Sequence, residues 1–483
     1  MDVVNKKWTE DYFFAERKKV LDMWPTGKDV DLDEAVEYHK NEPHSKNCAL
    51  KSLQSKEKEI TYLWPSLGTD TIASHKELLL HMQKKGEVDF LASYLDSLTR
   101  NCRFKEAEQE LRKAKKKGKA MLNGFPIVVH GIKGCREVID AVDLPVLFLG
   151  PSPDVRLAHE IGIAGGHTGY SGGPLISFWN YTKDIPVEKI IHNYQYSHRL
   201  MGYYEERGVP LLYCVSGAMP SISPPSLMIV PEIIEVLIAA EQGVKHIRLN
   251  AWLQGNIAQD IAYILTFKKL ADEYLERLGY QDVHTTTYST NPTGRYPTDH
   301  EQVYALNSYF TMIGRLAAVQ GIGSRTIDEA SHIPTKEGSA KSFRSIKVII
   351  DMVQPQNISV RDNYSVKAEI HILEKEVKSI LDKVIEMGDG DIITGTQIAI
   401  DAGVLDQPYA TTQHVKGKVM GVKDSEGAAR FFDLGNLPFA REIFDFHKYK
   451  IANREKQIGK KVDYETVIKD LTALSHGAIL PFE

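Results

Sequence analysis

Short runs of β-branched and aromatic residues alternate with longer amphipathic stretches from about residue 60 to about residue 330. This alternation predicts an α/β fold with a parallel sheet, and its length fits a (β/α)8 TIM-type barrel, typically about 250 residues long. The candidate strands are 60–64, 88–95, 125–130, 146–149, 167–170, 211–215, 246–250, 283–288 and 324–328. Since a barrel needs eight strands, one of these runs is expected to be a loop, and the pattern does not single it out.

The charge and hydrophobic pattern divide the chain into three regions. Residues 1–59 are charged and helical in pattern, and we expect them to form an N-terminal helical extension. Residues 60–345 hold the predicted barrel, whose clearest helix starts after Asn256, a favourable N-cap residue, and ends at Gly279. In residues 346–483 a helical pattern over 366–387 leads into loops rich in Gly and Asp, which predicts a C-terminal α+β region.

Composition removes several classes of protein. Hydrophobic residues make up 42% of the chain and charged residues 25%, as in globular proteins. A net charge of −5 argues against nucleic acid as a partner. The four cysteines are widely spaced and include no C-x-x-C, which favours a reducing, cytoplasmic compartment and no structural metal site. The N-terminus lacks a secretory pattern, and the apolar stretch 226–240 contains Pro231, Glu232 and Glu235, so we expect no membrane partner.

Residues 169–173 match G-x-S-x-G, the nucleophile elbow of α/β-hydrolases, with Ser171 at its centre. A candidate strand precedes the motif, but the residues from Pro174 onward do not resemble a helix start. A glycine-rich loop at a strand end is therefore the favoured interpretation, and a hydrolase is the minor alternative.

Two other motifs are incomplete. Gly27-Lys28 lacks the remaining residues of a phosphate-binding loop. The segment beginning Asp282-Val283-His284 starts like the D-x-H-x-x-G cobalamin-ligand motif, but Thr287 occupies its glycine position. The histidines that could gather at a barrel mouth are too far apart in sequence to diagnose a metal site.

Polar residues at predicted strand ends carry the clearest chemistry, because these ends meet at the mouth of a barrel. An arginine there suits a carboxylate, since its planar fork binds both oxygens, although a solvated charge on the rim is the alternative for any one arginine. These residues predict a barrel enzyme with an anionic substrate. They are Ser66, Gly68, Arg100, Ser171, Arg325 and Glu329.

Several strings resemble the large (epsilon) subunit of glutamate mutase, also called methylaspartate mutase. Each is modest alone, but they keep their order and approximate spacing nearly from end to end. They are 24–32 (WPTGKDVDL), 99–100 (TR), 122–126 (LNGFP), 134–136 (GCR), 153–156 (PDVR), 239–245 (AAEQGVK), 333–337 (IPTKE) and 435–439 (GNLPF).

The resemblance implies a barrel subunit of an adenosylcobalamin-dependent mutase. In such an enzyme the cofactor supplies a radical, and a carbon fragment of the substrate migrates. The implied partner is a small cobalamin-binding subunit, and the implied assembly is a heterotetramer with a homodimer of barrels. The cobalamin-ligand motif belongs to the small partner, so its absence here is expected.

The family's cofactor-contacting positions correspond to a set that is mostly intact. Tyr296 stands where the family has phenylalanine, and Arg325 replaces a lysine, which keeps the charge but changes the hydrogen-bond geometry. The complete set is Gly68, Asn123, Tyr296, Arg325, Glu329 and Ile333.

The substrate-contacting positions differ from the family pattern. Of three arginines that grip the carboxylates of glutamate, only Arg100 remains, with Ser66 and Leu149 at the other two positions. Ser171 replaces the carboxylate that contacts the substrate amine, Ser177 replaces a tyrosine, and Tyr181 is kept. We therefore expect a different, less anionic carboxylic acid as substrate. A non-catalytic barrel that binds a cobalamin subunit and an ordinary glutamate mutase subunit are the alternatives.

Overall fold

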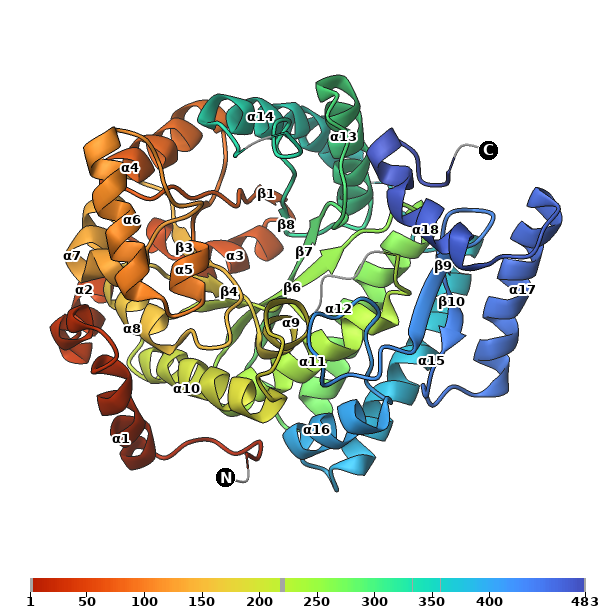
Figure 1. The fold of residues 1–483 in the computed structure, drawn as a ribbon, viewed down its shortest axis with the longest axis horizontal. Coiled ribbons are helices and arrows are strands. Elements are labelled where there is room, and N and C mark those ends of the chain that lie inside the picture. Colours follow the sequence, from red (N-terminus) through yellow and green to blue (C-terminus); the bar gives the residue numbers. More distant parts are fainter. Residues whose placement is uncertain (1–2, 218–221, 332, 357, 482–483) are drawn as a thin grey trace.

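The structure is a computed structural model that describes residues 3–217, 222–331, 333–356 and 358–481. Its centre is a parallel sheet of eight strands in the order β1-β8-β7-β6-β5-β4-β3-β2, which Figure 1 shows curling around a common interior. The strands are β1 (Tyr62–Leu63), β2 (Leu91–Tyr94), β3 (Val146–Leu149), β4 (Gly169–Ser171), β5 (Leu212–Cys214), β6 (His246–Trp252), β7 (His284–Thr290) and β8 (Gly321–Ile322).

Backbone hydrogen bonds join the two ends of this sheet. The amide of Phe90 donates to the carbonyl of Leu63 at 3.2 Å, and the amide of Tyr94 donates to the carbonyl of Leu67 at 2.8 Å. These bonds connect the segments that carry β1 and β2, so the sheet closes on itself. The predicted (β/α)8 barrel is confirmed.

Two of the nine candidate strands are wrong. Residues 125–130 pair only through a single bridge from Phe125 to Leu95 and then enter helix α7 (Ile127–Ile139), since Pro126 cannot donate to a ladder and suits a helix start. The last strand is Gly321–Ile322, just before the predicted 324–328. In that segment the Ile327 amide donates to the Ser342 hydroxyl instead of to a neighbouring strand.

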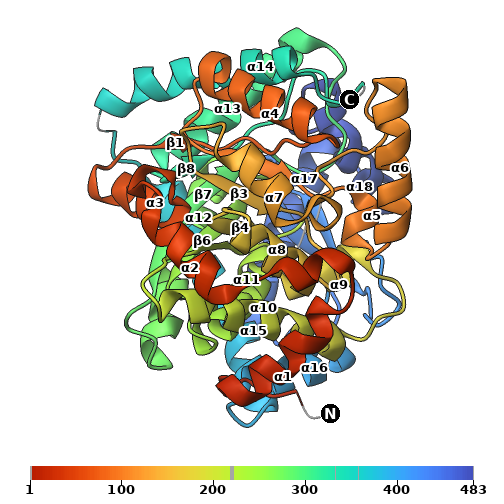
Figure 2. The same cartoon turned by 90° about the vertical axis from the view of Figure 1, so that its left-hand side faces the viewer.

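Helices surround the barrel on the outside of the strands, as Figures 1 and 2 show. The predicted cap is confirmed in α12, where the Asn256 side chain accepts from the Gln259 amide at 2.9 Å. Helix α14 crosses the domain boundary expected at residue 345, and the division into domains stays a prediction. The helices of this region are α4 (Ile72–His81), η3 (Met82–Gly86), α5 (Ser97–Arg100), α6 (Phe104–Lys117), α7, α8 (Arg156–Ala164), α9 (Pro174–Tyr181), α10 (Val187–Glu205), α11 (Ser226–Glu241), α12 (Ile257–Arg277), α13 (His300–Leu316) and α14 (Lys336–Val353).

The N-terminal segment is helical, as expected, and its last helix packs against the barrel near the amino ends of the strands. Cys48 of α3 packs in one apolar cluster with Leu147 and Leu212, near the amino ends of β3 and β5. The hydroxyl of Ser52 lies 2.9 Å from that of Thr286 in β7. The elements are α1 (Glu10–Leu21), η1 (Pro25–Asp29), α2 (Leu32–Asn41), η2 (His44–Lys46) and α3 (Cys48–Glu57).

The C-terminal region is an α+β layer that lies beside α12, on the blue side of Figure 1. Strands β9 and β10 form an antiparallel pair, and α15 packs along α12. None of the described helices combines the length and the apolar character needed to cross a membrane. The elements are η4 (Gln354–Gln356), α15 (Tyr364–Met387), α16 (Ile392–Ala402), β9 (Val419–Lys423), β10 (Ala429–Leu434), α17 (Arg441–Ile458), α18 (Tyr464–Ala473) and η5 (Leu474–His476).

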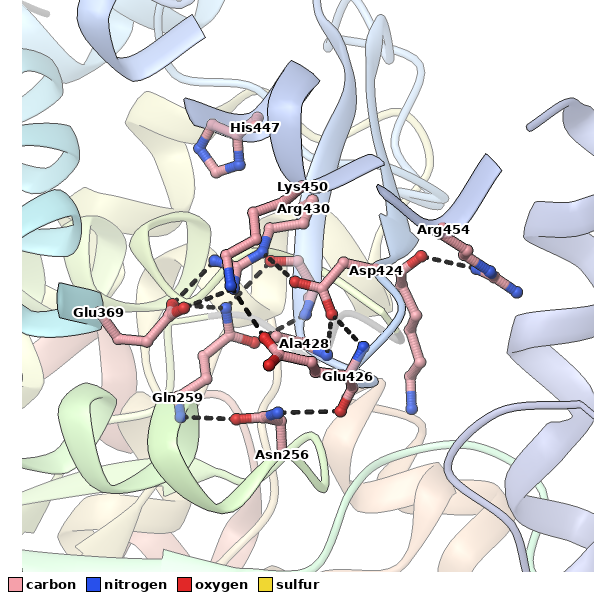
Figure 3. Close-up of polar contacts among 12 residues, drawn as sticks. Asn256, Gln259, Glu369, Asp424, Glu426, Ala428, Arg430, His447, Lys450 and Arg454 are labelled. Carbon is pink, nitrogen blue, oxygen red and sulfur yellow. Dashed lines mark hydrogen bonds and ion pairs between the residues drawn. The ribbon is translucent and has the colours of Figure 1, made fainter. Parts of the chain in front are cut away.

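A buried polar network fixes this layer to the barrel (Figure 3). Arg430 of β10 donates to Asp424 at 2.7 Å and binds both carboxylate oxygens of Glu369 in α15. Gln259 of α12 accepts from the Ala429 amide at 2.7 Å. Since removing one partner of a buried ion pair leaves an uncompensated charge, this network strongly favours one placement of the hairpin.

Candidate functional site

A cavity of about 610 Å³ opens at the carboxyl ends of the barrel strands. Residues from all eight strands or the loops after them contribute to its wall, together with Ile176 and Tyr181 from α9 and Phe343 from α14. The wall comprises Trp64, Pro65, Ser66, Tyr94, Leu147, Leu149, Pro151, Ser171, Ile176, Tyr181, Ser216, Arg248, Asn250, Trp252, Tyr288, Thr290, Thr293, Gly294, Ser324, Arg325, Thr326, Glu329, Pro334 and Phe343. This is the end of a barrel at which enzymes of this fold place their active sites.

The deep part of the cavity combines aromatic rings with one cation. Trp64 stacks on Phe90 with 3.3 Å between the ring centroids, and Tyr288 meets Trp64 edge-on. The guanidinium carbon of Arg248 lies 4.4 Å from the Trp64 ring centroid and 4.0 Å from that of Tyr288. Arg248 also donates from Nε to Asn250 Oδ1 at 3.2 Å, so its position is fixed from several sides.

Four of the six predicted substrate residues line this cavity: Ser66, Leu149, Ser171 and Tyr181. Ser177 lies elsewhere, because its hydroxyl is fully buried and donates to the carbonyl of Gly173 at 2.7 Å. The wall therefore brings together Ser66, Leu149 and Ser171, the three positions at which the resemblance implies charged residues in the family.

Arg100, the sixth predicted residue, stands immediately behind the wall. It ends helix α5, whose start is capped by Asp96 accepting from the Leu98 and Thr99 amides. Its guanidinium carbon is 5.5 Å from the ring centroid of Tyr94 and 5.3 Å from that of Tyr181, and both rings face the cavity. Burial raises the pKa of Tyr181 to about 12, so the phenol stays protonated at neutral pH.

The expectation that no helix follows the G-x-S-x-G motif is wrong. Helix α9 begins at Pro174, where the fixed φ of proline suits the first turn. Ser171 thus does stand on a strand–turn–helix segment. The described residues of the cavity wall include no histidine, which is the base that a hydrolase elbow requires.

A second cavity, of about 490 Å³, lies outside the first and shares four wall residues with it. Arg325 donates from Nη1 to Glu329 Oε1 at 2.5 Å, and its guanidinium carbon is 5.7 Å from the Tyr296 ring centroid. The Tyr296 hydroxyl accepts from Asn291 at 2.7 Å. Three of the six predicted cofactor residues, Tyr296, Arg325 and Glu329, therefore line one continuous mouth.

The other three predicted cofactor residues do not line this mouth. Gly68 packs so closely that a Cβ there would meet the Tyr94 carbonyl oxygen at 2.7 Å. Asn123 is exposed and accepts from the Ser97 amide at 3.2 Å. The side chain of Ile333 is 65% exposed. The structure does not place these three in either cavity wall.

Metal ligands do not gather in the described part of the chain, where no group of three His, Cys, Asp or Glu side chains could hold an ion. His167 bonds to the Ser93 hydroxyl at 3.0 Å, and His130 bonds to the Asp70 carbonyl at 2.7 Å. Both are structural contacts away from the cavity.

The comparison with protein families decides what this barrel is. The model of the methylaspartate mutase E chain matches residues 42–481. The chain belongs to this family.

Curated relatives agree with the assignment over the whole chain. This methylaspartate mutase E chain homologue is 37% identical to the glutamate mutase epsilon subunit of Desulfitobacterium hafniense (strain Y51), over 99% of each chain. It is 38% identical to the subunit of that name from Treponema denticola, over 99% of this chain and 98% of that one. The solved structure of phosphonopyruvate hydrolase with oxalate and Mg++ superposes only weakly, with a TM-score of 0.32 and 11% identity over 68% of this chain and 95% of that one.

Neither the resemblance to the methylaspartate mutase family nor the pattern of polar residues at predicted strand ends pointed to Arg248. The available signal was the alternation along β6, where positions 248, 250 and 252 are polar or amphipathic and face the cavity, while Ile247, Leu249 and Ala251 face the helices. Two buried acids of α11, which do not line the cavity, were also not singled out. Glu235 accepts from the Leu175 amide at 2.8 Å and Glu232 from the Asn250 amide at 3.2 Å, and burial raises the pKa of both well above the ordinary value.

Proposed function

We propose that the chain is the barrel subunit of an adenosylcobalamin-dependent carbon-skeleton mutase whose substrate is a carboxylic acid other than L-glutamate. Family membership supports a mutase subunit. One observation supports a different acid: Ser66, Leu149 and Ser171 line the cavity at the three positions where the family resemblance implies arginine, arginine and a carboxylate.

The outer cavity offers a donor set that fits the adenosyl part of the cofactor. Arg325 holds one oxygen of Glu329, and the carboxylate can accept hydrogen bonds from ligand hydroxyls with its other oxygen. Tyr296 provides an aromatic face beside this pair. When bound, adenosylcobalamin supplies a radical that removes a hydrogen atom from the substrate.

The residues of this chain then bind, orient and shield. Arg100 is our proposed partner for a substrate carboxylate, and Tyr181, whose phenol remains protonated, can donate to the same group. The rings of Trp64, Tyr288 and Trp252 limit the access of water to the deep part of the cavity. Exclusion of water protects a reactive intermediate from side reactions.

The proposal includes a small cobalamin-binding subunit, in a heterotetramer that contains two barrels. Ile333 is an exposed large apolar residue next in sequence to Pro334 of the cavity wall, as a residue that meets a partner or cofactor would be. We also propose a cytoplasmic location, which the four free cysteines support.

Two alternatives remain as outcomes of the test. An ordinary glutamate mutase subunit is favoured by the names of the curated relatives. A non-catalytic barrel would have no need of the Arg325–Glu329 pair, which the chain retains.

Reconstitution with a cobalamin-binding subunit tests the proposal. The complex is mixed with a panel of small carboxylic acids, and loss of the cob(III)alamin absorbance is followed. We expect an acid other than L-glutamate to cause this loss. No spectral change with any acid favours the non-catalytic barrel, and a response to L-glutamate alone favours the ordinary subunit.

A further inference from the structure

Arg248 is a buried cation whose side chain reaches the substrate cavity. It lies in the middle of β6, points into the barrel with Asn250 and Trp252, and is only 5% exposed. Its neighbours in the deep cavity are the rings of Trp64 and Tyr288. Its place in the barrel is thus set by a strand and two rings, and not by a flexible loop.

No described carboxylate lies within 4.0 Å of this guanidinium as a salt-bridge partner. Its Nε donates to Asn250 Oδ1, while Nη1 and Nη2 make no hydrogen bond to any residue that the structure describes. Glu232 is close enough for Arg248 to lower its pKa, but burial has the larger effect and raises that pKa well above the ordinary value, which favours the uncharged acid. The only acid among the described wall residues is Glu329, and it is bonded to Arg325.

A buried charge without a partner is costly, and proteins normally compensate it with an opposite charge or hydrogen bonds. The two aromatic rings stabilise the cation only in part. The unbonded Nη atoms on the cavity side leave the guanidinium fork ready for a group with two oxygens, such as a carboxylate. The missing counter-charge is therefore most simply supplied by the ligand.

The strand order places Arg248 across the barrel from Arg100. Arg100 follows β2, and β2 is four strands from β6 in either direction around the closed sheet. Neither arginine has a described carboxylate partner, so one cation lines the cavity from β6 and a second stands directly behind the opposite wall, beside Tyr94 and Tyr181. At position 171 the wall has a serine and no acid that could compensate a substrate ammonium group.

We propose that Arg248 binds a second anionic group of the substrate, so that the cavity takes a small dicarboxylate that carries no amine. This inference deepens the proposed function. Any reaction of the bound dicarboxylate still rests on that proposed function. It replaces the expectation of a less anionic acid, which counted Arg100 as the only remaining cation.

Binding to the full chain, without cobalamin or a partner subunit, tests the role of Arg248. Isothermal titration with glutarate, butyrate and L-glutamate at fixed ionic strength compares two carboxylates, one carboxylate, and two carboxylates with an ammonium group. We expect glutarate to bind at least tenfold more tightly than butyrate or L-glutamate. Equal affinities for glutarate and butyrate would overturn the proposal.

Variants assign the effect to one residue. Arg248→Met should weaken glutarate binding at least tenfold and remove its advantage over butyrate, and Arg248→Lys, which keeps the charge but not the fork, should fall between. Arg277→Met removes one positive charge from an outer helix and should change no affinity. Wild-type glutarate affinity in a folded Arg248→Met chain contradicts the role.

If Arg248→Met does not fold, the melting temperature of the wild-type chain provides the test. Glutarate should raise the melting temperature of the wild-type chain more than butyrate does at equal ionic strength, and an equal effect of the two acids counts against the proposal. If glutarate binds through Arg248 but no acid changes the cob(III)alamin spectrum of the complex, the proposed function fails while the role of Arg248 stands.

Discussion

Arg325 and Glu329 form an ion pair, with Nη1 of the arginine 2.5 Å from Oε1 of the glutamate. Both residues line the first cavity, at the carboxyl ends of the barrel strands, and also the outer cavity. The pair therefore stands where a substrate in the barrel would meet a cofactor at its mouth. A second hydrogen bond, from Arg325 Nη2 to the Pro292 carbonyl at 3.3 Å, holds the arginine in this place.

Glu329→Gln should slow radical formation without unfolding the protein. The amide keeps the size of the carboxylate but loses the charge and one acceptor, and such a hydrogen bond contributes about 1–3 kcal/mol. The rate of substrate-dependent loss of cob(III)alamin absorbance should fall roughly 5- to 150-fold. Glu301→Gln, an exposed position on α13, is the matched control. A wild-type rate in Glu329→Gln would show that this residue does not contact the cofactor.

Arg100→Met should nearly abolish turnover of any true substrate. Truncating one partner of a buried charge pair costs about 2–5 kcal/mol, so kcat/KM should fall roughly a hundredfold or more. Arg103→Met, three residues further on and half-exposed, removes the same charge and should retain activity. Similar kcat/KM values for the two variants would place the carboxylate site elsewhere.

Arg430→Met should destabilise the protein strongly. It leaves Glu369 and Asp424 buried without their cation, which typically costs about 3–5 kcal/mol. Arg441→Met is the control, since Arg441 is 91% exposed and its loss should change the free energy of unfolding by about 0.5 kcal/mol or less. Urea unfolding followed by circular dichroism measures both, and equal stabilities would mean that the network does not hold the C-terminal layer.

His198→Phe should reduce the sensitivity of the fold to acid. Both ring nitrogens of His198 are buried without a hydrogen-bond partner among the described residues, and burial lowers its pKa to about 3. Between pH 6.5 and 3 the unfolded chain binds a proton here and the folded chain does not, so the free energy of unfolding falls as the pH falls. The variant should lower this slope by up to about 1.4 kcal/mol per pH unit between pH 5.5 and 4. An unchanged slope from urea titrations would contradict the assignment.

Much of the barrel could be predicted from hydrophobic runs, because buried parallel strands have few polar residues. The failures occurred where a local bond outweighed the pattern. The apolar run 125–130 becomes the start of a helix because of Pro126. The run 324–328 resembles a strand in sequence but lies in a loop, where the Ile327 amide donates to the Ser342 hydroxyl. Helix α9 was not expected, because the residues from Pro174 onward do not resemble a helix start, yet proline is favourable at the first position.

The site was only partly predictable for a different reason. Ser66, Leu149 and Ser171 were found through the family resemblance, and the structure places all three in one wall. Arg248 lies inside a strand, where a single charged residue resembles an ordinary surface position. Only the closed barrel shows that its side chain faces the interior and lies against Trp64 and Tyr288 without a counter-charge.

The turnover of L-glutamate by the reconstituted complex tests the central claim most directly. The ammonium group of glutamate would find Ser171 where the family resemblance implies a carboxylate, and an uncompensated charge costs several kcal/mol. At about 1.4 kcal/mol per factor of ten, kcat/KM for L-glutamate should lie roughly a thousandfold or more below that of the best acid in the panel. The Ser171→Glu variant should narrow this gap. Efficient conversion of L-glutamate to 3-methylaspartate by the unaltered chain would contradict the account and make the protein an ordinary glutamate mutase subunit.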